Sequence, residues 1–287
     1  MDFVEVLVQG ITLGCAYAIV ALGFVLVFKA TSVLNLAYGA IIMLLSYLLA
    51  FFSTTHGWPL WLCLIALFPI SAFICMIIER FTIRKLIGRP FLASLVLTLA
   101  LGLVLSGIIV LVWGGQSFSY RFLPVGGIKL GEIIVMPAGA WAFVAAVAVF
   151  AIMWLFFRYT SIGLAMRVTA ASHPVAQSLG IIVRRIFSLS WMMSGLVATV
   201  GALLMGSLFV VDLGLGDYSL ATGLPVLLLG GMESIAGALV GGILMGVAVS
   251  VAGYFDMHSE IVPWLFMLFV LLVKPHGLFG QKRIERI

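Results

Sequence analysis

Long apolar runs recur along the whole chain, separated by short polar connections. A helix that crosses a bilayer needs about 20 mostly apolar residues, and eight runs meet or approach that length. They cover residues 6–28, 33–52, 58–78, 91–113, 137–157, 187–209, 235–254 and 261–274. The pattern predicts an all-α fold, a polytopic transmembrane helical bundle.

A ninth stretch, 219–230, is short and interrupted by Gly223 and Pro225. Such a segment is typical of a half-helix or re-entrant piece, because irregular backbone at membrane depth must be shielded from lipid. We therefore expect eight or nine spanning segments, one of them short and broken.

The basic residues are distributed unevenly between the connections. If 219–230 crosses fully, one set of connections holds every Lys and Arg except Arg121 and Lys129. Cytoplasmic loops carry the excess of Lys and Arg, so the N-terminus is expected outside and the C-terminus in the cytoplasm. If 219–230 were re-entrant, the basic C-terminal tail would lie outside, so the distribution of Lys and Arg favours a full crossing.

Composition agrees with a membrane protein. The chain is 64% hydrophobic and 9% charged, with a mean hydropathy of +1.31, whereas soluble domains are about half apolar and about a quarter charged. No polar linker divides the runs, so residues 1–287 are expected to form a single permease-like membrane domain. The net charge of +5 is explained by the connections and not by a nucleic-acid surface.

Known catalytic motifs are absent from the sequence. There is no GxxxxGK[ST] loop, HExxH, GxSxG or clustered His/Cys/Asp/Glu set, so nucleotide hydrolysis, metal and acyl chemistry have no candidate site. We expect no enzyme, no metal and no cofactor. The predicted spans also hold no Asp, Lys or Arg at mid-membrane depth, which argues against a proton-coupled carrier.

Neutral polar residues inside the spans are the candidates for a solute pathway. They are Gln9, Thr12, Asn35, Tyr38 and Thr98. Ser and Thr side chains also bond their own helix backbone or a neighbouring helix. Asn35 and Tyr38 are expected one turn apart on one helix face, either lining a pathway or bonding structurally.

The connection 158–186 is amphipathic and too polar to span. Residues 166–179 are expected to form a short helix, interrupted near Pro174 and ended at Gly180. Such a helix suits a permease that receives force from a separate motor. The alternative is a helix lying at the membrane interface.

Glycines recur at helical spacing in the segment 237–246 and again at Gly10 and Gly14. Small residues let helices approach closely in lipid. The segment is expected to pack within this chain or to form an interface with another subunit.

Four segments carry a resemblance to a known family. They are LNLAYG (34–39), SLGI (178–181), GGMESIAGALVGG (230–242) and KPHGLFGQKRIERI (274–287). In this order and spacing the chain resembles LivH-type permeases of branched-chain amino acid ABC importers over essentially its whole length.

The resemblance implies a set of partners and roles. The partners would be a second, LivM-type permease, two cytoplasmic ABC ATPase subunits and an extracytoplasmic substrate-binding protein, in a bacterial inner membrane. Asn35 would belong to the motif of the second span. The coupling loop to the ATPase would use Arg167, Ala171, Ser172, His173 and Gly180, and helix packing or the permease interface would use Gly230, Gly231, Ser234, Gly237, Gly241 and Gly242.

Departures from the family pattern leave the identity of the transported solute undetermined. Tyr38 stands where His is common, Leu36 where Phe is common, and Glu233 where a small residue is frequent. Ser172 and His173 replace an acidic pair, and His173 is expected to be a surface residue. Branched-chain amino acids are the first candidate for the transported solute, and urea, short amides or aromatic acids are the alternatives. A hypothesis from another class is that the chain is a self-contained channel or ion-coupled carrier.

Overall fold

The computed structural model describes residues 3–86, 90–120, 122, 128–130, 133–258, 261–274 and 277–280. Every predicted apolar run contains a helix, which confirms the all-α prediction. The helices are α1 (Phe3–Thr31), α2 (Tyr38–Ala50), α3 (Leu60–Phe81), α4 (Phe91–Trp113), α5 (Pro137–Tyr159), α8 (Val183–Leu208), α9 (Gly214–Gly230), α10 (Ile235–Tyr254) and α11 (Val262–Val273).

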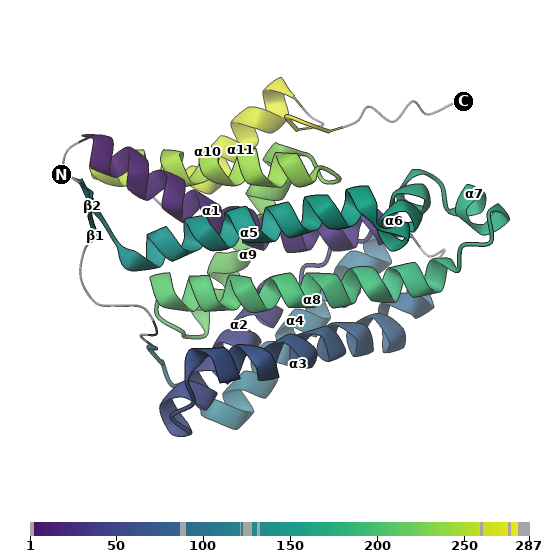
Figure 1. The fold of residues 1–287 in the computed structure, drawn as a ribbon, viewed down its shortest axis with the longest axis horizontal. Coiled ribbons are helices and arrows are strands. Elements are labelled where there is room, and N and C mark those ends of the chain that lie inside the picture. The colour runs from purple at the N-terminus through teal and green to yellow at the C-terminus, as the bar shows by residue number, and fades with distance from the viewer. Residues whose placement is uncertain are drawn as a thin grey trace.

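Smaller elements complete the described chain. A π-helix, η1 (Phe51–Thr55), extends α2, and a 3-10 helix, η2 (Ile83–Leu86), follows α3. Helices α6 (Ser161–Ala171) and α7 (His173–Ser178) form most of the connection between α5 and α8. Strands β1 (Ile128–Leu130) and β2 (Ile133–Val135) pair antiparallel beside the start of α1 (Figure 1).

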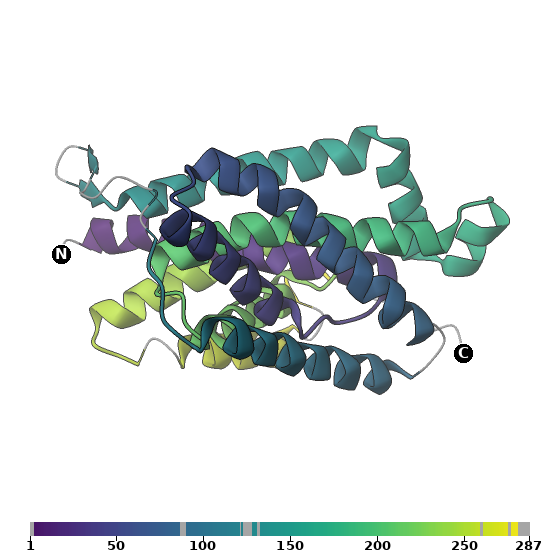
Figure 2. The same cartoon turned by 90° about the horizontal axis from the view of Figure 1, so that it is seen from below.

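Seven helices of the described chain are long and apolar enough to cross a membrane, counting η1 with α2 and η2 with α3. Helices α9 and α11 are shorter. The long helices run roughly along the longest axis of the molecule, and α6 and α7 gather at one end of it (Figures 1 and 2).

Helix α1 forms the centre of the bundle and packs against α5, α8, α9 and α10. All its residues from Gly14 to Phe28 are buried. The tightest contact is with α10, where a Cβ at Gly14 would lie 2.6 Å from the Gly242 carbonyl oxygen and one at Gly10 would lie 2.7 Å from the Val247 Cα. Only glycine permits this approach, as expected for helix packing in lipid.

The second predicted span begins later than the sequence indicates. The expected helix 33–52 starts at Tyr38, and residues 32–35 are neither helix nor turn. Ser32 has a φ of 54° and turns the chain out of α1. The Leu34 carbonyl accepts a hydrogen bond from Thr98 Oγ1 (3.3 Å) and the Asn35 carbonyl accepts one from the Tyr38 N–H (3.1 Å), so these groups are satisfied without a helix.

The short segment 219–230 is part of a longer and continuous helix. Helix α9 begins at Gly214 and runs through Gly223 and Pro225 without a break, so the predicted interruption is wrong. Gly223 and Pro225 are buried against neighbouring helices, and a Cβ at Gly223 would lie 2.6 Å from Val20 Cγ1. The glycine serves close packing on α1 and does not break the helix.

A buried ion pair joins the end of α3 to the start of α8. Glu79 is fully buried and accepts hydrogen bonds from Arg84 Nε (3.0 Å) and Nη2 (2.7 Å). Ser188 Oγ lies 2.7 Å from the same carboxylate and 2.6 Å from Arg84 Nη2. A buried carboxylate needs such partners, so this cluster fixes the two helices to each other.

Candidate functional site

One end of the bundle gathers basic side chains from several elements, and we call it the basic end. Lys29 of α1 and Arg167 of α6 line one pocket, while Arg84, Arg184 and Arg185 line another. Lys29 Nζ also lies 5.4 Å from the centre of the Phe157 ring, next to Arg158 at the end of α5. Helices α6 and α7 project at this end (Figure 1).

Local capping explains the two helices of the connection. Thr160 caps α6 by accepting a hydrogen bond from the Gly163 N–H (2.9 Å), and Ser172 caps α7 at its start. The chain breaks at Ser172, beside Pro174, and turns at Gly180 with a φ of 77°, so the predicted interruption and end are confirmed. The helix begins at Ser161 and not at residue 166, because Thr160 supplies a cap.

Helix α7 is docked onto the bundle. Ala176 is buried with Val183 and Phe187 of α8. His173 packs its ring 5.4 Å from that of Phe187, and its Nε2 lies 3.3 Å from the carbonyl oxygen of Ala30 in α1. His173 is therefore half-buried and hydrogen-bonded, so it is less exposed than a free surface side chain.

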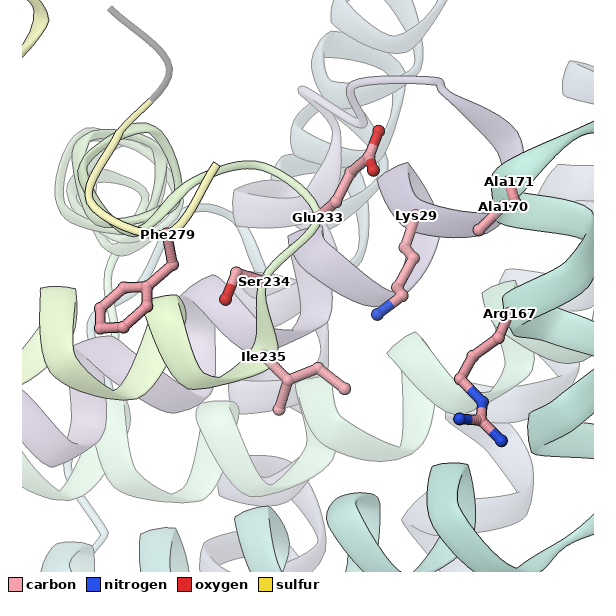
Figure 3. A pocket seen from close by; sticks show the side chains of 8 residues that line it. All are labelled: Lys29, Arg167, Ala170, Ala171, Glu233, Ser234, Ile235 and Phe279. Carbon is pink, nitrogen blue, oxygen red and sulfur yellow. The ribbon is translucent and has the colours of Figure 1, made fainter. Parts of the chain in front are cut away.

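A pocket of about 360 Å³ lies where α1, α6 and the α9–α10 connection meet. Figure 3 shows Lys29 between Arg167 and Ala171 of α6 on one side and Ser234 at the start of α10 on the other. The predicted coupling residues Arg167 and Ala171 thus share one site with Ser234 of the glycine-rich motif. Glu233 also lines this pocket, so the pocket carries side chains of both charges.

The glycine-rich motif packs inside the chain. The backbones of Gly230 and Gly237 touch each other, and a Cβ at Gly242 would lie 2.5 Å from the Ala18 Cβ. Gly241 faces Leu229, and Gly231 adopts a φ of 98° beside Gly280. Ser234 caps α10 by accepting a hydrogen bond from the Gly237 N–H at 2.9 Å.

Asn35 lies inside the bundle on the irregular segment before α2. The carbonyl of its neighbour Leu34 accepts a hydrogen bond from Thr98. Thr98 lies two turns into α4, about 10 Å from the Phe91 end of that helix. The Asn35 side chain is 2% exposed, and neither its amide oxygen nor its amide nitrogen has a hydrogen-bond partner among the described residues. Such a group costs about 1–3 kcal/mol, so it suits a site that meets a polar group at another stage.

The other candidate pathway residues make side-chain contacts elsewhere in the bundle. Tyr38 is fully buried, its ring centre lies 4.8 Å from that of Phe24 in a tilted arrangement, and its hydroxyl donates a hydrogen bond to the Ser194 carbonyl at 3.3 Å. It does not share a helix face with Asn35, which precedes the helix. Gln9 and Thr12 sit on the first turns of α1, where Thr12 Oγ1 donates to the Gln9 carbonyl at 2.9 Å. The structure therefore joins Thr98 and the Tyr38 backbone to the Asn35 segment, whereas Gln9 and Thr12 contact each other on α1.

Sequence reasoning missed two kinds of charged residue. Lys29 and Glu233 were assigned no role at the coupling site, although both line its pocket. Asp217 lay just outside the predicted segment 219–230 but falls in the first turn of α9. Among the described residues, no group of three or more His, Cys, Asp or Glu side chains is placed to hold a metal ion.

Several known proteins match this chain over nearly its whole length. The permease protein BraD of the high-affinity branched-chain amino acid transport system of Pseudomonas aeruginosa is 27% identical over 302 residues, covering 99% of this chain and 98% of that protein. LivH of the corresponding system of Escherichia coli is 26% identical over 305 residues, with the same coverage. The probable LivH of Methanocaldococcus jannaschii is 25% identical, covering 94% and 90%.

The match to a family is nearly as long as the chain. Residues 6–273 match the family described as branched-chain amino acid transport system / permease component. That range contains the irregular Asn35 segment, the α6–α7 connection and the glycine-rich motif. The chain belongs to the branched-chain amino acid transport system permease component family.

Proposed function

We infer that this chain is the membrane-spanning permease subunit of an ATP-driven importer for branched-chain amino acids. It would work with a related second permease, two cytoplasmic ATPase subunits and an extracytoplasmic binding protein. The observation that carries the proposal is the α6–α7 helix pair, which is displayed at the basic end of a bundle whose sequence has no nucleotide-binding loop.

The basic end would face the cytoplasm of a bacterial cell. Described basic residues at the ends of α1, α3, α5 and α11, within α6 and at the start of α8 support this orientation, because cytoplasmic connections carry the excess of Lys and Arg. The same orientation places the β1–β2 hairpin outside. It also requires α9 to count as a crossing, as the Lys and Arg distribution favours.

Transmission of force would pass through α6 and α7. The two helices contact α1 through His173 and Ala30, and contact α8 through Ala176 and Phe187. Movement of α7 would therefore be passed to α1 and α8, two long helices that are mostly buried. The pocket between Arg167, Lys29 and Glu233 would open or close as α6 moves against the α9–α10 connection.

Arg167→Ala tests this role. The guanidinium is exposed at the rim of the coupling pocket, so its loss is expected to leave the fold intact. We expect solute uptake to fall at least about fivefold, as for the loss of one coupled contact of about 1 kcal/mol. Arg158→Ala, at the same end but outside that pocket, is the matched control and should leave uptake unchanged.

The solute would pass beside the irregular segment before α2, with Asn35 exchanging polar partners during transport and Thr98 holding the segment. Asn35→Ala removes an amide that has no partner in this conformation. The free energy of unfolding of this variant should differ from that of the wild type by less than about 1 kcal/mol, whereas solute uptake should be lost. Uptake at the wild-type rate would rule out Asn35 as a pathway residue.

The substrate is tested by uptake of labelled leucine in a deletion strain and in the same strain with the gene restored. Unlabelled isoleucine, urea, a short amide and benzoate serve as competitors. We expect uptake to depend on the gene and to be suppressed by isoleucine alone. Unchanged leucine uptake with loss of another solute's uptake would reject branched-chain amino acids and retain the permease role.

A further inference from the structure

A second large cavity, of about 510 Å³, lies between α9, α10 and α11. Its wall is mostly apolar and includes Val249 and Pro263. Three polar side chains line it as well: Asp217 and Tyr218 are adjacent in α9, and Thr222 lies one turn later. A cavity of about 300–1,000 Å³ with an apolar wall and a few placed polar groups is typical of small-molecule sites.

The polar side of this cavity lies deep in the bundle. The Tyr218 hydroxyl is 2.6 Å from the hydroxyl of Tyr17, and Tyr17 is the middle residue of α1, about 21 Å from either end of that helix. Asp217 precedes Tyr218 and differs from it by about 1.5 Å along α9. Asp217 therefore lies in the first turn of α9, next to a residue that reaches the centre of the bundle. Within membrane helices, ionisable groups are costly and mark pathways.

Asp217 has no structural task that explains its position. It is exposed, and it forms no ion pair or hydrogen bond with the described part of the chain. The start of α9 is capped by Asp212, whose Oδ1 accepts hydrogen bonds from the N–H groups of Gly214 (2.9 Å) and Leu215 (3.1 Å). No lysine or arginine is among the residues that line the cavity.

Aromatic side chains complete the environment of the carboxylate. Tyr218 is held by its bond to Tyr17 and by Phe209, whose ring lies 4.6 Å away. Trp264, at the start of α11, lines the same cavity and is 43% exposed. A carboxylate beside aromatic faces attracts a primary ammonium group by charge and by cation–π contact.

We propose that this cavity is a subsite for the ammonium group of the transported amino acid, with the Asp217 carboxylate as the acceptor. Tyr218 and Trp264 flank the ammonium group, and the apolar wall at Val249 and Pro263 receives the aliphatic side chain. The subsite rests on the proposed transport function, and it assigns recognition of the solute to the permease itself.

The test measures ligand protection of a single cysteine in the complete importer in lipid nanodiscs. Ala221→Cys places a thiol in the cavity wall, while the chain's own Cys15, Cys63 and Cys75 are buried. Maleimide labelling is timed with L-leucine, with 3-methylbutylamine, which keeps the ammonium group, and with 4-methylpentanoate, which lacks it. Asp217→Asn and Asp217→Glu are combined with the cysteine, and Asp256→Asn is the matched control.

Leucine and 3-methylbutylamine should slow labelling, whereas 4-methylpentanoate should not. Asp217→Asn should raise the half-protecting concentration of leucine at least about tenfold, as for loss of a charged hydrogen bond. Asp217→Glu should keep the protection by 3-methylbutylamine, and Asp256→Asn, an exposed aspartate on the α10–α11 connection, should have no effect.

Equal protection by 4-methylpentanoate, or unchanged protection in the Asp217→Asn variant, would overturn the subsite. Neither result depends on uptake. If the importer carries no leucine in cells while 3-methylbutylamine still protects the cysteine, the proposed substrate fails and the ammonium subsite stands.

Discussion

Helices α1 and α4 are both strongly apolar, yet they occupy opposite places in the bundle. In their most apolar windows, 78% of α1 residues and 11% of α4 residues are buried. Helix α1 is rich in Gly and Ala where it meets α10, whereas α4 presents large side chains such as Leu103 and Leu111. Lipid tails are as apolar as Leu, so side-chain size and fit, not apolarity, decide which helix is central.

Truncating one leucine in each helix should give the largest difference in stability between a change in α1 and the same change in α4. Leu22 of α1 is fully buried, and Leu111 of α4 is 86% exposed. Leu22→Ala should lower the free energy of unfolding by about 2–5 kcal/mol, because it leaves a cavity. Leu111→Ala should change it by less than about 0.5 kcal/mol. Thermal unfolding in detergent measures both, and equal losses would contradict the assignment of core and lipid faces.

A paired substitution in the α3–η2 region extends the comparison to charge. Arg84→Ala leaves the buried Glu79 carboxylate without its main partner. We expect a loss of about 2–3 kcal/mol, below that of a fully buried pair because the Arg84 side chain is 29% exposed. Arg80→Ala, which replaces the exposed residue directly after Glu79, is the control. Similar unfolding temperatures for the two variants would show that the buried pair has no stabilising role.

The smallest effect is expected from adding one methyl group to each helix. A Cβ at Gly14 would meet the α10 backbone at 2.6–2.7 Å, whereas one at Gly107 of α4 has no atom within 4 Å. Gly14→Ala should cost about 1–3 kcal/mol through overpacking, and Gly107→Ala should be neutral or stabilising by less than about 1 kcal/mol. A stable Gly14→Ala variant would mean that α1 and α10 separate easily.

Helix number and the shape of the coupling connection could be predicted from sequence. Long apolar runs have little alternative in lipid, and Pro174 and Gly180 act through local backbone geometry. Arg167 and Ala171 of the predicted coupling loop line the same pocket as Ser234 of the glycine-rich motif. Their meeting was not predictable, because it depends on how α1, α6 and α10 pack.

Failures of prediction concern segments whose partners are distant in sequence. The irregular backbone at Asn35 is compensated by Thr98 of α4, which no local pattern reveals. The length of α9 was underestimated because Gly216 and Asp217 resemble a loop, although Gly216 packs beside Met43 of α2. Burial of Glu79 likewise depends on Ser188, more than 100 residues away.

The most direct test of the central claim is the energy source of uptake by the complete importer in liposomes. Labelled leucine uptake is measured with ATP and Mg²⁺ on the ATPase side, and separately with an imposed proton or sodium gradient and no ATP. We predict accumulation with ATP and none with either gradient. Accumulation driven by a gradient without ATP would contradict the account and identify an ion-coupled carrier.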